Sequence, residues 1–465
     1  MRPEEAAAEI AAEARQPHFG LQRQVLGPLE TLAQSISTMA PTATATLTVP
    51  LVFASAGNGT WLSYVGATVC TLLVALCIAR FARESASPGS LYSYATSSLP
   101  LAVGSVAAWA LLLAYVATGA SVVGGFVHYA NVVLGESLGR AAPAWILAAF
   151  AALISIWIAY RDVKVSARLM VYIEVVSVLL ISFVFVLLLW RGGLHFDPVQ
   201  LKLSGVNFSG VRLGMVLAMF SFVGFESATT LGEEAKHPLR NIPRAVLQSV
   251  TLSGLFFIAA SYTEVLGFPA SAGTLDRSAA PLGALSIAAG VRRLGPFIDL
   301  CAMVSMFACT LACVTAAARV LLLMAHNGIV HRALAATHAK NETPHAAVMA
   351  TGAGTILLSV GLIIFKVSGE TIYDWMGTLA TYGFIVVYAL VAIALPIHLK
   401  RLGKMTAGAV VLAILAVAAM VMVLEGTLYP VPDFPKNYLP YLFLAYLGCG
   451  VGWHWCRAKR EPESA

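Results

Sequence analysis

The sequence predicts an all-α integral membrane protein with twelve transmembrane helices, arranged as a 5+5 inverted repeat plus two C-terminal helices. Three observations support this fold class. Of the 465 residues, 59% are hydrophobic and 11% are charged, whereas soluble domains average about 25% charged residues. Apolar runs of the ~20 residues that a membrane helix needs recur along the chain. Two of these runs, one in each half, are interrupted by polar and helix-breaking residues.

The expected helices follow one another in order, and the ends of the apolar runs set their boundaries. They are residues 30–53, 60–81, 101–134, 141–160, 169–190, 210–232, 246–267, 297–324, 345–367, 372–398, 405–424 and 438–456. The first 28 residues are polar and lack the apolar core and cleavage site of a secretory signal. We therefore expect a cytoplasmic tail over 1–28, a core over 29–400 that holds helices 1–5 and 6–10 as the two repeats, helices eleven and twelve over 401–456, and a cytoplasmic tail over 457–465.

The distribution of lysine and arginine predicts the orientation. If the N-terminus is cytoplasmic, 20 of the 29 Lys and Arg residues fall in cytoplasmic segments, as the positive-inside rule requires. Both termini are therefore expected in the cytoplasm, in a chain that spans the cell (cytoplasmic/inner) membrane. This orientation signal accounts for the net charge of +6, so no nucleic acid partner is expected. The seven cysteines form no CxxC pair and have no His partners at zinc spacing, so neither a metal nor a cofactor is predicted.

Two helices carry interruptions near their middle. In LAQSISTMAPTATATLTVPL (32–51), Pro41 lies among serine and threonine residues. Proline removes a backbone donor, clashes with the preceding turn, and disfavours the helical conformation of the residue before it. In FSFVGFESATT (220–230), Gly224 costs ~1 kcal/mol relative to alanine in a helix interior. Glu226 in the same stretch has no charged neighbour within five residues on either side.

Each interruption alone is compatible with a simple kink, but their positions match. They lie in the first and sixth helices, which begin two five-helix sets of opposite orientation. Such a pattern is typical of an inverted-repeat secondary transporter with its binding site at the membrane midplane. Irregular backbone at this depth is tolerated only beside protein or a cavity. Free amides at the half-helix N-termini suit a substrate carboxylate.

Three separated segments resemble the amino acid–polyamine–organocation (APC) superfamily, and in particular its amino acid permeases. MFSFVGFESATTLGEEAKHPLRNIPRAV (219–246) is similar to the sixth-helix signature, and IARFARESASPGSLYSYATSSLPLAVGSVAAW (78–109) to the link between the second and third helices. AARVLLLMAHNGIVHRALAATHAKNETPHAAV (317–348) resembles the end of the eighth helix. The resemblance implies the leucine-transporter-type fold and alternating access.

The resemblance also implies where substrate is held. In family members the substrate carboxylate meets the first-helix break, and its amine meets carbonyls of the sixth helix. Phe220 matches an aromatic residue that closes over the substrate from outside, and the third helix supplies weaker candidates for the pocket wall. The implied substrate-binding residues are Thr38, Met39, Ala40, Pro41, Thr42, Ala43, Thr44, Tyr115, Thr118, Phe220, Ser221, Phe222, Val223 and Gly224.

The chain departs from the family pattern in three places. MAPTATA stands where the first helix commonly has Gly-Ser-Gly, which leaves fewer accessible amides. The fifth-helix lysine of some proton-coupled relatives falls near Ser177, with Glu174 one turn earlier. The eighth-helix hydroxyls of sodium-coupled members fall at Ala312 and Cys313. Neither usual coupling site is therefore intact. The missing sodium hydroxyls favour coupling to protons over sodium, with Glu226 and Glu174, beside Phe220, as candidate gating or coupling residues.

Acidic residues within apolar runs need a reason, because a carboxylate at the bilayer centre costs ~2.5–3.5 kcal/mol by insertion scales. Glu226 is interpreted either as a gate or proton carrier, or as an acid that caps broken backbone. Glu174 is interpreted either as a coupling group or as a buried hydrogen-bonding acid. Glu264 and Asp299 lie near the outer ends of their helices and are expected to be solvated.

These features predict a secondary active transporter of a small amine-bearing solute, with an amino acid as the leading substrate. The expected driving force is an ion gradient, protons before sodium, or exchange of substrates. Two alternatives stay open: a transporter of amines or polyamines, which the missing glycines favour, and a transport-fold sensor that binds without moving substrate. No Ser-His-Asp or metal-ligand arrangement suggests an enzyme. The expected partners are the small-molecule substrate and the lipid bilayer, for a monomer or homodimer.

Overall fold

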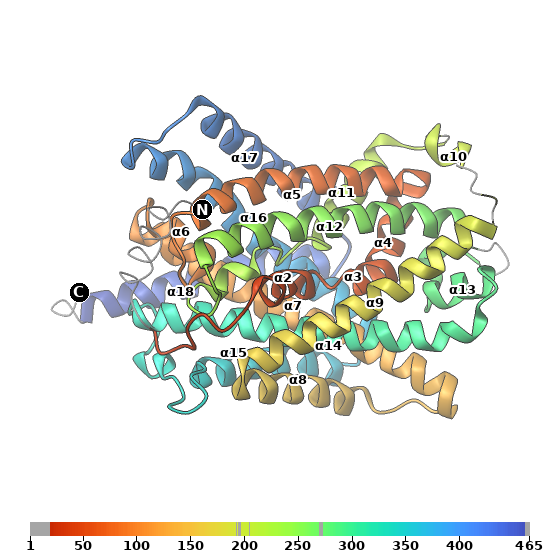
Figure 1. Cartoon of the computed structure of the whole chain (residues 1–465), viewed down its shortest axis with the longest axis horizontal. Helices are drawn as coiled ribbons and strands as arrows, with labels where there is room; N and C mark the ends of the chain where they lie inside the picture. Colours follow the sequence, from red (N-terminus) through yellow and green to blue (C-terminus); the bar gives the residue numbers. More distant parts are fainter. Residues whose placement is uncertain (1–18, 192, 194–196, 204, 269–272, 461–465) are drawn as a thin grey trace.

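The computed structural model describes residues 19–191, 193, 197–203, 205–268 and 273–460 (Figure 1). Within this part of the chain, the only strand-like pairing is a parallel bridge between Leu26 and Ala235. The rest of its regular structure is helical. Its α-helices are α2 (Pro28–Met39), α3 (Pro41–Ala43), α4 (Val49–Ala56), α5 (Thr60–Ala82), α6 (Ser90–Thr96), α7 (Leu101–Leu138), α8 (Ala144–Arg161), α9 (Val163–Arg191), α10 (Pro198–Leu201), α11 (Phe208–Phe220), α12 (Pro238–Gly267), α13 (Pro281–Ala288), α14 (Gly295–His326), α15 (His345–Ile364), α16 (Gly369–Arg401), α17 (Ala407–Leu428) and α18 (Leu439–Arg460).

The helices agree with the expected membrane class. Among the described residues, nine segments are long and apolar enough to cross a membrane. One of them, Pro28–Ala82, contains the first two expected helices, whereas α11 has only 13 residues and α18 is outside the nine. An all-helical integral membrane protein is therefore confirmed. The number of twelve spans, the 5+5 repeat and the domain boundaries stay predictions.

The long helix α7 packs against both α14 and α16 in the bundle. Small residues let their backbones approach closely, as is common in membrane bundles. A Cβ atom at Gly124 of α7 would lie 2.6 Å from the backbone oxygen of Gly369 in α16. A larger residue at this position would therefore push the two helices apart.

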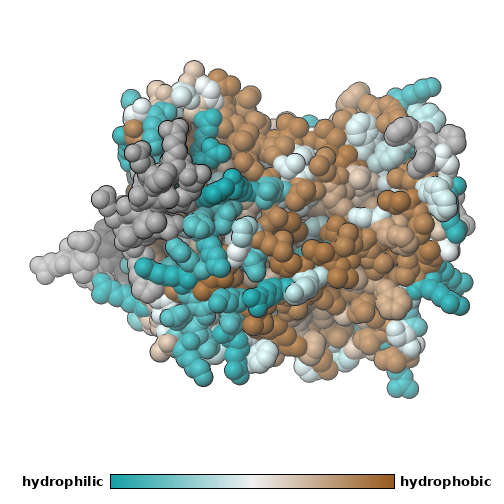
Figure 2. All heavy atoms as spheres, viewed as in Figure 1, coloured by the Kyte–Doolittle hydropathy of each residue, from teal (hydrophilic) through white to brown (hydrophobic). Residues whose placement is uncertain are grey.

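The surface has the polarity that a membrane requires. A broad hydrophobic area lies between the two ends of the bundle, and hydrophilic side chains gather at its ends (Figure 2). One end, here called the basic end, carries Arg23, Lys236 and Lys404, and it is the end that the lysine and arginine distribution assigns to the cytoplasm. On the lipid-facing side of α9, Val176 and Leu179 are well exposed.

Two acidic residues contradict their expected environment. Glu264 of α12 and Asp299 of α14 were expected to be solvated, but both are buried. Their carboxylate oxygens have no hydrogen-bond partner among the described residues. The expectation was wrong because α13 packs against both α12 and α14: a Cβ at Gly283 of α13 would lie 3.2 Å from Asp299 Oδ2.

Candidate functional site between two interrupted helices

The first membrane helix is interrupted at Ala40, next to the proline that predicts the interruption. Helix α2 ends at Met39, Ala40 has a left-handed φ of 46°, and the chain re-enters helix at Pro41. The left-handed region is unfavourable for a residue with a Cβ, and proline cannot donate a backbone hydrogen bond to the preceding turn. The next segment, Thr44–Thr48, is a π-helix, which is frequent at functional sites. The first membrane helix therefore departs from regular α-helix at Ala40 and again over Thr44–Thr48.

The sixth membrane helix is interrupted more extensively than a single glycine kink. Helix α11 ends at Phe220, residues 221–226 form turns, and a 3-10 helix covers Ser227–Leu231. Gly224 has a φ of 85°, a value that glycine adopts without steric cost. The membrane segment expected over 210–232 is therefore a helix followed by non-α backbone.

The two interruptions lie against each other. Thr38 Oγ1 and Ser227 Oγ are 2.8 Å apart, and Ser227 Oγ donates to Gln34 O at 3.0 Å. The backbone N–H of Ala228 donates to Ser35 Oγ at 3.0 Å. All these groups are buried, so hydroxyl groups of one broken helix satisfy backbone groups of the other.

Gly224→Ala is expected to destabilise the protein by about 2–5 kcal/mol. The positive φ at this position lowers the stability of a protein with any residue that has a Cβ there by roughly 1–2 kcal/mol. The added Cβ would also lie 2.2 Å from Thr38 Cγ2, and this overpacking lowers stability by about 1–3 kcal/mol more. Gly403→Ala is the control, because Gly403 has a φ of 68° and nothing within 4 Å of the added Cβ. Equilibrium unfolding in mixed micelles measures both variants.

The same experiment separates backbone strain from the contact with Thr38. In a Gly224→Ala background, Thr38→Ser removes Cγ2 and keeps the hydroxyl, so it should recover part of the lost stability. Equal losses in Gly224→Ala and Gly403→Ala, with no recovery, would show that the two broken helices are not in close contact.

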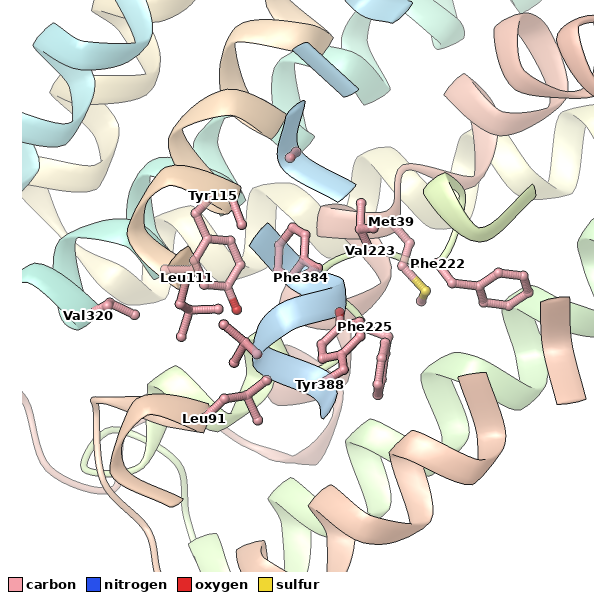
Figure 3. Close-up of a cluster of buried hydrophobic side chains, with 14 of the residues drawn as sticks. Met39, Leu91, Leu111, Tyr115, Phe222, Val223, Phe225, Val320, Phe384 and Tyr388 are labelled. Atoms are coloured by element: carbon pink, nitrogen blue, oxygen red, sulfur yellow. The ribbon is translucent and has the colours of Figure 1, made fainter. Parts of the chain in front are cut away.

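Glu226 lies at the junction of the two breaks and is held by two tyrosines. Tyr115 Oη of α7 donates to Glu226 Oε1 at 2.7 Å, and Tyr388 Oη of α16 donates to Oε2 at 2.6 Å. The backbone N–H of Gly224 points at Tyr388 Oη, 3.3 Å away. Both tyrosines belong to a buried cluster in which Phe225 lies beside Tyr388 (Figure 3). The carboxyl group thus joins the sixth-helix break to two continuous helices.

Helix α14 forms a further wall against the first break. Gln34 Nε2 donates to Ala312 O at 3.0 Å, and Cys309 Sγ donates to Thr38 O at 3.2 Å. Cys313 lies one turn further on, with its sulfur 4.0 Å from that of Cys309. Where the resemblance places sodium-binding hydroxyls, the structure therefore has thiols and backbone carbonyls.

Phe220 covers the site on the side away from the basic end. Its ring meets the Tyr373 ring edge-on, with centroids 5.4 Å apart, and a Cβ at Gly377 would lie 2.5 Å from Phe220 Cζ. Tyr373 Oη in turn is 2.8 Å from Thr48 Oγ1. Beyond this aromatic pair lies a small cavity of about 40 Å³, lined by both rings. The expected role of Phe220 as a lid stays a prediction.

A buried ion pair lies near the basic end. Arg319 of α14 makes two hydrogen bonds to the carboxylate of Glu234, one of them from Nε at 2.6 Å. The backbone oxygen of Glu234 accepts from the N–H groups of Val25 and Leu26, at 2.8 Å and 2.9 Å. The segment before α2, the segment after the sixth-helix break and α14 are thereby tied together.

The structure brings together some of the predicted site residues and separates others. Thr38, Gly224, Glu226 and Tyr115 form one connected group. Ser221 Oγ instead lies 3.3 Å from Tyr64 Oη.

Two further candidates lie apart from this group. Thr118 donates to Ala114 of its own helix at 2.8 Å. Glu174 belongs to another cluster, in which it accepts a hydrogen bond from Ser305 at 2.9 Å.

Sequence reasoning missed several residues of the site: Gln34, Tyr388, Cys309 and the Arg319–Glu234 pair. Gln34 stands in the polar run that marks the first break, so its position was a usable signal. Tyr388 lies in an ordinary apolar run with nothing nearby to mark it. Its role follows only from the packing of α16 against the sixth-helix break.

The helical bundle and its paired interruptions have the fold of a known class of membrane proteins, to which a solved transporter belongs. The structure superposes on a solved Na⁺-coupled sialic acid symporter, in its substrate-bound outward-open state, with a TM-score of 0.56 over 91% of this chain and 96% of the other. Sequence identity in this alignment is 11%, so it is the fold that is shared.

The chain belongs to the amino acid permease family, whose model matches residues 31–462. The protein is thus a membrane permease and not an enzyme, and the resemblance stated from its motifs is confirmed. Similar curated proteins include the branched-chain amino acid permease BcaP of Bacillus subtilis (27% identity over 65% of this chain and 68% of the relative) and BcaP of Lactococcus lactis (25%, 82% and 83%). The low-affinity putrescine importer PlaP of Escherichia coli is 26% identical over 63% of this chain and 66% of its own length.

Proposed function

We propose that this protein is a secondary active transporter that moves a small amine-bearing solute, an amino acid, across the cell membrane by alternating access. The observation that carries the proposal is the contact between two interrupted membrane helices around a buried carboxyl group, Glu226. Backbone groups freed at such breaks are suited to a polar substrate at the midplane. The names of the similar permeases and of the putrescine importer support amino acids and amines as the substrate classes.

The first candidate substrates are branched-chain amino acids, and the second class is polyamines. The first break supports an amino acid less strongly than a glycine-rich break does, because Pro41 has no N–H and Ala40 carries a Cβ beside its own amide. Glu226 is a counter-charge that suits an amine. These two features of the site favour the amine class, whereas the names of the similar permeases favour branched-chain amino acids.

Uptake into proteoliposomes separates these possibilities. Labelled leucine and labelled putrescine are offered in parallel to vesicles with and without the protein. Accumulation of leucine supports the amino-acid assignment, and accumulation of putrescine alone replaces it with amine transport. Saturable binding of either compound without flux identifies a transport-fold sensor and contradicts transport.

We further propose that protons drive uptake, or that substrates are exchanged, with the basic end in the cytoplasm. The reason is chemical: hydroxyls that suit Na⁺ are replaced at Ala312 and Cys313, whereas Glu226 is an acid inside the site. Imposed pH and sodium gradients are the test. Uptake that follows the pH gradient at zero sodium supports the proposal, and uptake that follows only the sodium gradient overturns it.

A further inference from the structure

A second cavity lies outside the site between the breaks, on the flank of the bundle. Helices α2, α9 and α12, together with Pro41, enclose about 330 Å³. This volume is at the lower end of the roughly 300–1,000 Å³ of small-molecule pockets. Apolar side chains such as Leu32, Val178 and Phe256 form most of the wall, and Glu174 and Ser253 supply its polar side chains.

Glu174 has an unused hydrogen-bonding atom in this wall. The residue is only 4% exposed, and its Oε1 accepts from Ser305 at 2.9 Å. Its Oε2 has no hydrogen-bond partner among the described residues. An unpaired buried oxygen costs about 1–3 kcal/mol, and more when it is charged. A donor placed in the cavity would remove this cost.

The cavity is reached from the lipid. Leu29 of α2, Leu179 of α9 and Leu252 of α12 line it and are 58%, 64% and 52% exposed, on the apolar flank of the bundle. In Figure 1, α2 and α3 are seen between α9 and α12, and in Figure 2 the same flank is largely hydrophobic. A ligand that enters here therefore comes from the bilayer.

We propose that this cavity binds a lipophilic amine, with its alkyl chain between α2, α9 and α12 and its ammonium group on Glu174 Oε2. The apolar walls accept an alkyl chain, and the carboxyl group with a free oxygen selects a cationic donor. An anionic headgroup would face like charge, and a plain hydrocarbon chain would leave Oε2 unpaired. The cavity shares Pro41 with the first break but does not include Glu226, so the proposal stands whether or not the protein transports a solute.

Thermal unfolding of the purified protein in nanodiscs tests the proposal with three probes of equal chain length: n-octylamine, 1-octanol and octanoate. A bound ligand raises the unfolding midpoint in a saturable manner. We expect octylamine to stabilise the wild-type protein, octanol to have a smaller effect, and octanoate none. In Glu174→Gln, the half-saturating concentration of octylamine should rise at least tenfold, equal to ~1.4 kcal/mol.

Two further variants keep the test decisive. Val178→Phe fills the cavity and retains the carboxyl group, so it should abolish the octylamine shift even if Glu174→Gln folds poorly. Glu264→Gln is the control, because the Glu264 carboxyl group is also buried and has no hydrogen-bond partner among the described residues, but it does not line the cavity. Octylamine should therefore stabilise this variant as much as the wild-type protein. An equal response to octylamine and octanol, or an unchanged response in Val178→Phe, overturns the proposal.

Discussion

Arg319→Ala should lower the free energy of unfolding by about 3–5 kcal/mol, because it leaves the Glu234 carboxylate buried without its partner. The two side chains are 2% and 0% exposed, and the guanidinium makes two hydrogen bonds to that carboxylate. A third bond runs from Arg319 Nη1 to Thr315 O at 2.8 Å. Equilibrium unfolding in mixed micelles measures the loss.

Lys404→Ala is the matched control for an ion pair at the same end. Lys404 Nζ lies 2.8 Å from Glu84 Oε1, but these side chains are 59% and 36% exposed, so water already solvates both charges. Removing one partner of such a pair changes stability by at most about 1 kcal/mol. Equal losses in Arg319→Ala and Lys404→Ala would contradict the burial of the Arg319–Glu234 pair.

Replacing both members of the buried pair gives a sharper result. Arg319→Met with Glu234→Leu removes both charges and retains side-chain volume, and such exchanges are often neutral or stabilising. The double variant should therefore be more stable than Arg319→Ala alone. If it also transports at a reduced rate, the pair contributes to opening and closing of the basic end more than to folding.

The first break and the turn at Gly224 could be predicted from the sequence because local chemistry causes them. Pro41 removes a backbone donor wherever the helix lies, and Gly224 is the residue in its stretch that best tolerates a positive φ. The extent of the second break was not predictable in this way. Residues 221–231 bond largely among themselves in turns, and Ser35 and Thr38 of another helix hold this stretch through Ala228 and Ser227, contacts that the local sequence does not reveal.

Contacts between residues far apart in the sequence could not be predicted either. Tyr388 and Glu226 are 162 positions apart, and nothing in either segment indicates the other. The expected solvation of Glu264 and Asp299 failed for the same reason, since it used the distance from the helix end and not the segment that covers it. Residue type and spacing thus located the interruptions, and tertiary packing determined what they contact.

Glu226→Gln should reduce gradient-driven uptake at least tenfold while substrate exchange is affected much less. Glutamine has nearly the same shape, and it can still accept from one tyrosine hydroxyl and donate to the oxygen of the other, so Tyr115 and Tyr388 keep their contacts. The variant removes the ability to carry a proton and leaves the packing in place. Net uptake driven by a pH gradient and counterflow at equal pH are the two measurements.

The tyrosine variants separate proton transfer from positioning. Tyr388→Phe removes one hydrogen bond to Glu226 and the contact with Gly224 N–H, but it retains the carboxyl group. If Glu226 carries the proton, Tyr388→Phe should slow net uptake and exchange together, because it disturbs the sixth-helix break that both processes use. If Glu226→Gln lowers net uptake and exchange by the same factor, the carboxyl group is instead a structural link between the sixth-helix break, α7 and α16. The ratio of net uptake to exchange therefore decides the role of Glu226, which neither rate alone can do.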